Sequence, residues 1–161
     1  MGGNTLCCAI FIFSPGENLV TTQTAYNEPA IPYARSGGPG ALISRVLLAA
    51  LFLIAGIGKL AAPAGTIAYI TAAGLPLPTI AYAVALLVEL GGGVLLIVGY
   101  RTRLVAAVMA VFTVVTALAF HSAWGDANQQ VNFLKNLAIA GGLLQLVLNG
   151  AGAYSLDRRA R

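Results

Sequence analysis

Charged residues are scarce in this sequence. They make up 9% of its 161 residues, against about 25% in typical soluble domains. Hydrophobic residues make up 58% of the chain, and its mean hydropathy is +0.85. This composition excludes an ordinary soluble protein and predicts an integral membrane protein. The length leaves no room for a separate soluble catalytic domain beside the apolar segments.

Cysteine and histidine are also nearly absent. The two cysteines, Cys7 and Cys8, are adjacent and lie outside the apolar segments, which predicts neither a disulfide framework nor thiol redox chemistry within the membrane. The single histidine, His121, cannot supply both axial ligands of a haem. The sequence has no zinc-protease, P-loop or dinucleotide-binding motif. We therefore expect no metal and no cofactor held by the chain itself.

Long apolar segments, by contrast, occur four times, at 41–60, 79–100, 104–120 and 131–148. Each approaches the ~20 residues that a membrane-spanning helix needs. The connections at 61–78 and 121–130 are predicted to be loops, and a tight turn at 100–103 joins the middle two segments. Short connections imply antiparallel neighbours. The predicted fold class is all-α, an integral membrane bundle of four antiparallel helices.

The basic residues predict the orientation of this bundle. With four spans both termini share one side, which then carries seven arginines: Arg35, Arg45, Arg101, Arg103, Arg158, Arg159 and Arg161. The other side has only Lys59 and Lys135. The positive-inside rule therefore places both termini in the cytoplasm. Topology explains the net charge of +4, so no nucleic-acid partner is expected.

Residues 1–40 do not follow the pattern of the rest of the chain. Their apolar run at 6–13 is too short to span a membrane and lacks the basic flank of a signal peptide. We interpret this segment as a disordered tail or as an upstream extension that was never selected for folding. The alternative is a short anchor at the membrane interface.

Glu89 lies near the middle of the second apolar segment. An ionised side chain at that depth costs at least ~2.5–3.5 kcal/mol, so it normally faces a polar partner or a water-filled cavity. Helical spacing puts Glu89 on one face with Tyr82, Ala85 and Gly92, where small residues allow close helix packing. We therefore expect Glu89 to point into the bundle.

Depth along the helices ranks the possible partners of Glu89, using ~1.5 Å of rise per residue. Lys135 lies closest to the midplane on the outer side, whereas Lys59 and His121 lie further out. Arg45 lies on the inner side and reaches either Glu89 or the cytoplasmic interface. We expect a Glu89–Lys135 pair. Lys59, His121 and Asn136 would then form a polar mouth that opens outward.

The fourth segment also carries a polar seam, which we expect to face other helices. Its members recur at helical spacing and comprise Lys135, Gly142, Gln145 and Asn149. The candidate catalytic residues are Glu89, Lys135 and His121, and the surrounding polar cluster comprises Lys59, Arg45, Asn136 and Tyr82. The alternative is purely structural, because a buried ion pair can fix the register of helices without binding a ligand.

An ordered series of residues across all four segments resembles the DoxX family of bacterial membrane proteins. The series runs from Arg45, Phe52, Gly56 and Lys59 through Gly74-Leu75-Pro76, Val88-Glu89-Leu90-Gly91-Gly92, Gly99, Arg101 and His121 to Lys135-Asn136, Gly142, Gly150 and Ser155-Leu156-Asp157. The resemblance covers residues 41–158. It implies a four-helix bundle in the bacterial inner membrane, with Glu89, Lys59, Arg45 and Lys135 at recurring polar positions.

Three alternative functions remain open, and they differ in whether the chain is an enzyme. The first is a membrane subunit of a redox or sulfur and oxidative-stress complex, related to the membrane subunit of thiosulfate:quinone oxidoreductase, with a quinone or proton site around Glu89. The second is a scaffold that anchors soluble oxidoreductases or sulfurtransferases through 101–103 or 155–161. The third is a small-anion carrier with a mouth of Lys59, His121 and Lys135, which would need to form a homo-oligomer. All three share the lipid bilayer as a partner.

Overall fold

The computed structural model describes residues 38–122 and 124–159. The regular structure of these residues is helical. Its elements are α1 (Pro39–Ala61), α2 (Pro63–Ala72), α3 (Pro78–Leu86), the π-helical turn η1 (Leu87–Gly91), α4 (Gly92–Val98), α5 (Thr102–Phe120), α6 (Ala127–Asn149) and the short α7 (Leu156–Arg159). The predictions of a tail or an interfacial anchor fall almost entirely on residues 1–37, which lie outside the described residues.

Four helices in the described part of the chain are long and apolar enough to cross a membrane. They are Pro39–Ala61, Pro78–Val98, Thr102–Phe120 and Ala127–Asn149, the second being α3, η1 and α4 in continuous succession. Three of the predicted segments lie inside these helices, and the segment 79–100 ends two residues beyond its helix. The predicted class, an all-α membrane bundle of four helices, is confirmed.

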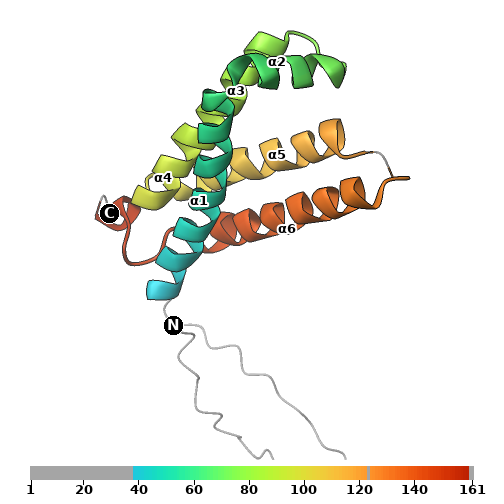
Figure 1. Cartoon of the computed structure of the whole chain (residues 1–161). Helices are drawn as coiled ribbons and strands as arrows, with labels where there is room; N and C mark the ends of the chain where they lie inside the picture. Colours follow the sequence, from blue (N-terminus) through green and yellow to red (C-terminus); the bar gives the residue numbers. More distant parts are fainter. Residues whose placement is uncertain (1–37, 123, 160–161) are drawn as a thin grey trace, which may run out of the picture. The chain divides into compact units, whose positions relative to one another are not determined.

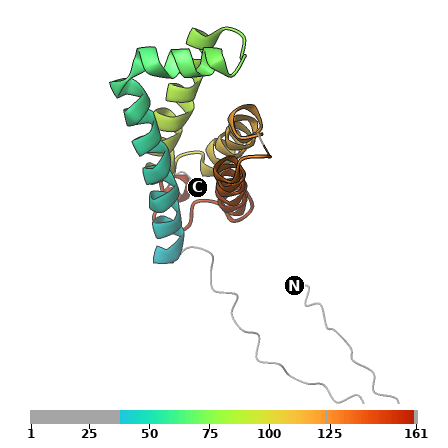
Figure 2. The same ribbon diagram turned by 45° about the vertical axis from the view of Figure 1, so that its right-hand side comes forward.

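The four long helices pack as two antiparallel hairpins. In Figures 1 and 2, α5 and α6 lie side by side, and α1 lies along the helix that α3, η1 and α4 form. The hairpins meet where α4 and η1 contact α5. The buried core at this junction comprises Ala49, Phe52, Leu96, Ala106, Met109, Ala110, Leu143 and Leu146. Its alanines allow helices to approach closely, as expected where lipid removes the hydrophobic drive for association.

Gly56 sets the distance between α1 and η1. A Cβ at this position would lie 2.7 Å from Cδ2 of Leu90 and 3.3 Å from Cβ of Glu89. The absence of a side chain therefore lets the backbone of α1 pack directly against the turn that carries Glu89. Lys59 lies three residues after Gly56, on the same face of α1.

Two of the predicted loops are partly helical. Residues 61–78 contain α2, which begins at Pro63, a residue whose fixed φ suits the first position of a helix. Residues 121–130 contain the first turn of α6, where the Asp126 carboxylate accepts a hydrogen bond from the Asn128 amide. These loop predictions were wrong because a search for long apolar runs detects neither a ten-residue helix nor a polar first turn capped by aspartate.

Hydrogen bonds fasten the C-terminal segment to one end of the bundle. At this end, which we call the Arg101 end, α4 meets α5 at a turn, and the C-terminal segment 150–159 folds back onto that turn. The Asp157 carboxylate accepts hydrogen bonds from the amides of Arg101 at 2.6 Å and Thr102 at 2.9 Å. The Asp157 amide donates to the carbonyl of Gly99 at 2.9 Å. Asp157 therefore caps the N-terminus of α5 from outside that helix.

Asp157→Ala is expected to lower the free energy of unfolding by about 1–2 kcal/mol, because the first amides of α5 lose their acceptor. The measurement is unfolding in mixed detergent micelles, followed by circular dichroism. Arg158→Ala, at the exposed neighbouring position, is the control and should change the free energy by less than ~0.5 kcal/mol. Equal losses in both variants would contradict the capping role.

Candidate functional site

Glu89 forms an ion pair with Lys59 inside the bundle. The Lys59 Nζ lies 2.7 Å from Oε1 and 2.8 Å from Oε2 of Glu89, so one ammonium bonds to both carboxylate oxygens. Glu89 is only 5% exposed. The neighbours on its face, Ala85, Gly92 and Leu96, are buried as well. Glu89 therefore points into the bundle, where charge compensation by Lys59 makes its ionised form tolerable.

The predicted Glu89–Lys135 pair was wrong. Lys135 is exposed on α6, and its Nζ lies 3.5 Å from Oδ1 of Asn132 on its own helix. Depth alone had favoured Lys135, but depth is only one coordinate of a side chain in a bundle. The close approach of α1 at Gly56 brings Lys59 beside Glu89, whereas α6 packs mainly on α5.

The polar seam of α6 does not face other helices of this chain. Lys135, Gln145 and Asn149 are exposed, and Asn149 donates a hydrogen bond to Gln145 within the helix. Gly142 alone lies near a second helix, with a Cβ position 3.5 Å from Leu48 of α1. The expectation failed because α6 packs through a different set of residues, Ala140, Leu143 and Leu146.

Arg45 does not reach Glu89. Its side chain is fully buried at the Arg101 end, where Nη1 donates to the carbonyl of Leu96 at 3.3 Å and Nη2 donates to the carbonyl of Tyr154. Arg45 therefore ties α1 to α4 and to the C-terminal segment. Tyr82 lies close to the ion pair instead, because its hydroxyl donates to the carbonyl of Lys59 at 3.3 Å.

The Glu89 carboxylate lies within the helical irregularity η1. The turn Leu87–Gly91 is π-helical, and regular α-helix resumes at Gly92. Single π-helical turns inside α-helices are rare and are found frequently at functional sites, because they rotate the following side chains relative to the preceding ones. The sequence predicted an uninterrupted helix here, since the apolar pattern does not reveal one extra residue per turn.

A cavity of about 460 Å³ lies beside the ion pair. It is partly open and is lined by α1, α2, α3, η1 and α5, and Asn136 contributes from α6. Most of its lining is aliphatic or aromatic, including Phe52, Phe112 and Phe120. Its volume falls within the ~300–1,000 Å³ typical of small-molecule sites, which are mainly apolar with a few polar groups.

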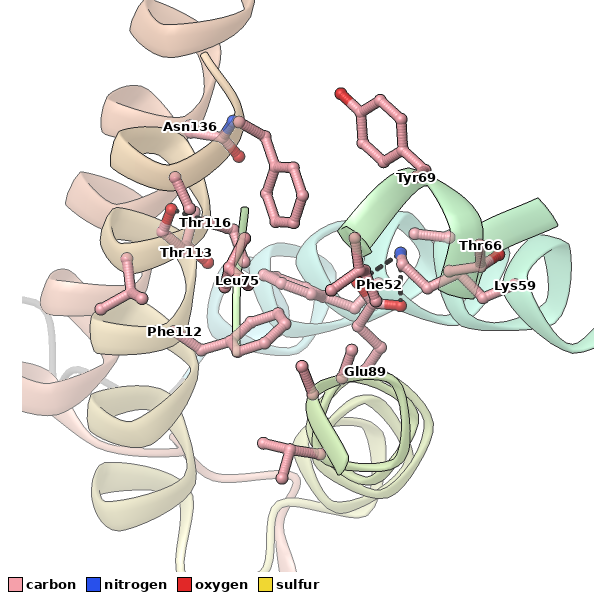
Figure 3. A pocket seen from close by; sticks show the side chains of 18 of the residues that line it. Phe52, Lys59, Thr66, Tyr69, Leu75, Glu89, Phe112, Thr113, Thr116 and Asn136 are labelled. Carbon is pink, nitrogen blue, oxygen red and sulfur yellow. Dashed lines mark hydrogen bonds and ion pairs between the residues drawn. The ribbon is translucent and has the colours of Figure 1, made fainter. Parts of the chain in front are cut away.

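Polar groups lie on two walls of this cavity. Figure 3 shows Lys59 and Glu89 on one side, with Thr113, Thr116 and Asn136 across from them on other helices. The Asn136 amide nitrogen donates to the carbonyl of Asn132 at 3.0 Å. The cavity thus presents charged groups on one wall and hydroxyl and amide groups on the facing wall.

His121 lies at the opposite end of the bundle from Arg101, which we call the His121 end. It is one of the residues that line the cavity, and its Nδ1 lies 2.7 Å from Oε1 of Gln129. Because a carbonyl oxygen accepts, Nδ1 donates this bond when the amide oxygen is placed as in the structure.

The predicted polar residues were only partly brought together. Lys59, Glu89, His121 and Asn136 line the cavity, whereas Lys135, Arg45 and Tyr82 are not among its lining residues. The lining residues Thr66, Phe112, Thr116 and Phe120 were missed. Thr113, Thr116 and Phe120 recur at i, i+3 and i+7 on α5, and that spacing was a usable signal for a shared face. No pattern in the sequence predicted that Gln129 would be the hydrogen-bond partner of His121.

These features define a class: a four-helix integral membrane protein in which a buried glutamate pairs with a partly buried lysine beside an apolar cavity. Comparison with known proteins also indicates an integral membrane protein. The family model described as DoxX matches residues 40–122. The chain is similar to the inner membrane protein YqjF of Escherichia coli K12, with 43% identity over 122 residues that cover 74% of this chain and 90% of that protein.

A second relative is the inner membrane protein YphA of the same organism, which is 37% identical over 123 residues, covering 73% of this chain and 88% of that protein. No solved structure matches the chain significantly. On the family match and these relatives, the chain belongs to the DoxX family. It is a membrane-embedded protein, and both of these relatives are proteins of the inner membrane.

Proposed function

We propose that this protein is the membrane subunit of a redox or sulfur and oxidative-stress system, and that the cavity beside Glu89 binds a quinone. The observation that carries this proposal is a buried, paired carboxylate on the wall of an apolar cavity at membrane depth. A carboxylate in such a place is costly and is best explained by function.

The chemistry of the lining fits a quinone ring. Phe52, Phe112 and Phe120 offer apolar and aromatic surface to a flat ring. Lys59 and Asn136 lie on facing walls and carry N–H groups of the kind that donate to carbonyl oxygens. A quinone carries two such oxygens on opposite edges of its ring.

Charge favours a neutral ligand over an anion. Lys59 is already neutralised by Glu89, and Lys135 is not among the residues that line the cavity. The mouth of Lys59, His121 and Lys135 that an anion carrier needs is therefore not supported. A neutral, membrane-soluble molecule avoids the cost of carrying a net charge into this site.

Glu89, assisted by Lys59, would transfer the protons that the reaction of the quinone requires. Reduction of a quinone to a hydroquinone takes up two electrons and two protons. The two electrons would come from a soluble oxidoreductase partner. Glu89 would pass each proton to a quinone oxygen and then regain a proton from water, while Lys59 stabilises the carboxylate between transfers. The arginine distribution supports a cytoplasmic Arg101 end, with both termini on that side.

Glu89→Gln is expected to lower quinone-linked turnover roughly 100-fold, because the amide cannot exchange a proton. The protein should remain in the membrane. The measurement uses wild type and variant purified with their partners in mild detergent, with a short-chain ubiquinone analogue as acceptor and mass spectrometry of what co-purifies.

Lys135→Met is the matched control, since it removes a charge on α6 outside the cavity lining. Its turnover should equal that of wild type. If Glu89→Gln turns over as fast as wild type, the quinone site is elsewhere or absent. If no quinone and no oxidoreductase accompany the wild-type protein, the ion pair serves structure alone.

A further inference from the structure

The helix α2 connects α1 to α3 at the His121 end through two non-helical joints. Before it, Ala62 has φ −135° and ψ 63°, and after it Gly74 has φ +74°. Pro63 fixes the start of the helix, and the glycine permits the left-handed turn that ends it. The helix is therefore a short rigid element between two joints where backbone torsion can change.

Few contacts hold α2 to the rest of the bundle. Ile70 is its one buried residue. Tyr69 is 54% exposed. An element with little buried apolar area separates from its neighbours at a low free-energy cost and does so before the bundle unfolds.

The same helix covers part of the cavity. Thr66, Tyr69 and Ile70 line it. The ring of Tyr69 stacks on the ring of Phe120 at the end of α5, with centroids 5.3 Å apart and planes inclined by 15°. This stack joins the α1–α4 hairpin side of the cavity to the α5–α6 side at the His121 end (Figure 3 shows Tyr69 beside the cavity).

We propose that α2 is a lid on the cavity, that the Tyr69–Phe120 stack is its latch, and that Ala62 and Gly74 are its pivots. A ligand enters or leaves when the stack separates and α2 turns away, while the Arg101 end stays fixed by Arg45 and Asp157. This inference rests on the proposed function, because a lid matters only if the cavity is occupied in turn by different molecules. Closure over a bound quinone would also exclude water from Glu89.

The lid can be tested without any quinone. In a chain carrying Cys7→Ser and Cys8→Ser, Thr116→Cys places one thiol in the cavity lining. The measurement is its rate of modification by N-ethylmaleimide in the purified protein. Tyr69→Ala or Phe120→Ala should raise this rate roughly three- to tenfold, the factor expected from losing one stacked aromatic pair.

Three controls separate the latch from a general loosening of the protein. Tyr69→Phe keeps the ring and should leave the rate unchanged. The double variant Tyr69→Ala with Phe120→Ala should react no faster than either single variant, because the two rings act as one contact. A thiol introduced by Tyr100→Cys at the opposite end, where Tyr100 is exposed, should react at the same rate in every background.

A parallel measurement follows the association rate of a short-chain ubiquinone analogue with the same latch variants. Faster modification at position 116 and faster quinone association support both the lid and the proposed function. Faster modification without quinone binding in any variant supports the lid and overturns the quinone site. Unchanged rates at position 116 in Tyr69→Ala and Phe120→Ala overturn the lid, whether or not quinone binds.

Discussion

Lys59→Met is expected to lower the free energy of unfolding by about 3 kcal/mol, the lower end of the cost of removing one partner from a buried ion pair. The reason is that Glu89, which is 5% exposed, would lose the ammonium that bonds to both of its oxygens. Unfolding in mixed detergent micelles, followed by circular dichroism, measures the loss.

Lys135→Met provides the matched control, because it makes the same substitution at an exposed position. It should change the free energy of unfolding by less than ~0.5 kcal/mol. A double variant, Lys59→Met with Glu89→Met, should recover most of the loss, since replacing both ions by apolar side chains leaves no uncompensated charge. If Lys59→Met is no more destabilised than Lys135→Met, the pair does not stabilise the bundle.

The double variant also separates a structural ion pair from a functional one. It should be folded and nearly as stable as wild type, yet it would have no carboxylate in the cavity. If the pair only fixes the register of α1 against η1, the activity of the complex survives in this variant. The proposed proton role requires that activity be lost although the fold is kept.

Gly99→Ala should have an effect of similar size, about 3 kcal/mol, at the other end of the bundle. Gly99 has φ +69°, a conformation that costs other residues ~1–2 kcal/mol. A Cβ there would lie 1.9 Å from Nη1 of Arg45 and 2.5 Å from Cβ of Ser155. Relieving that clash must move a buried arginine and the C-terminal segment together, and overpacking of this kind costs a further ~1–3 kcal/mol.

Gly74→Ala measures how much of the stability loss expected for Gly99→Ala comes from the backbone conformation alone. Gly74 has φ +74°, but nothing lies within 4 Å of its Cβ position. Its substitution should cost only ~1 kcal/mol. The measurement is again unfolding in mixed micelles, together with the amount of protein that accumulates in the membrane. Equal losses at both glycines would show that the contact with Arg45 and Ser155 contributes nothing.

The packing of the C-terminal segment also changes how the scaffold hypothesis must be tested. A truncation after Asn149 removes Tyr154, which accepts from Arg45, and Asp157, which caps α5. Loss of a partner protein from such a truncation would follow from a weakened bundle as readily as from a lost docking site. Substitution of the exposed Arg158 is a more specific test of docking.

The sequence by itself determined the class of this protein. Composition and the length of apolar runs depend only on the membrane as solvent, so four spans and an all-α fold could be read directly. The same reasoning identified Glu89 as the residue that needs an explanation, because the cost of a charge at membrane depth does not depend on which helices are neighbours. Helical periodicity then predicted that Glu89 faces inward.

The tertiary structure decided which groups meet. Depth along a helix is a local property, but the lateral neighbour of Glu89 depends on how α1 packs on η1, which Gly56 allows through the absence of a side chain. The packing of α6 through Ala140, Leu143 and Leu146 leaves its polar seam exposed. Arg45 is buried against the carbonyls of Leu96 and Tyr154. The cavity and the lid proposed over it arise from several helices at once, and no single segment of the sequence encodes such a space.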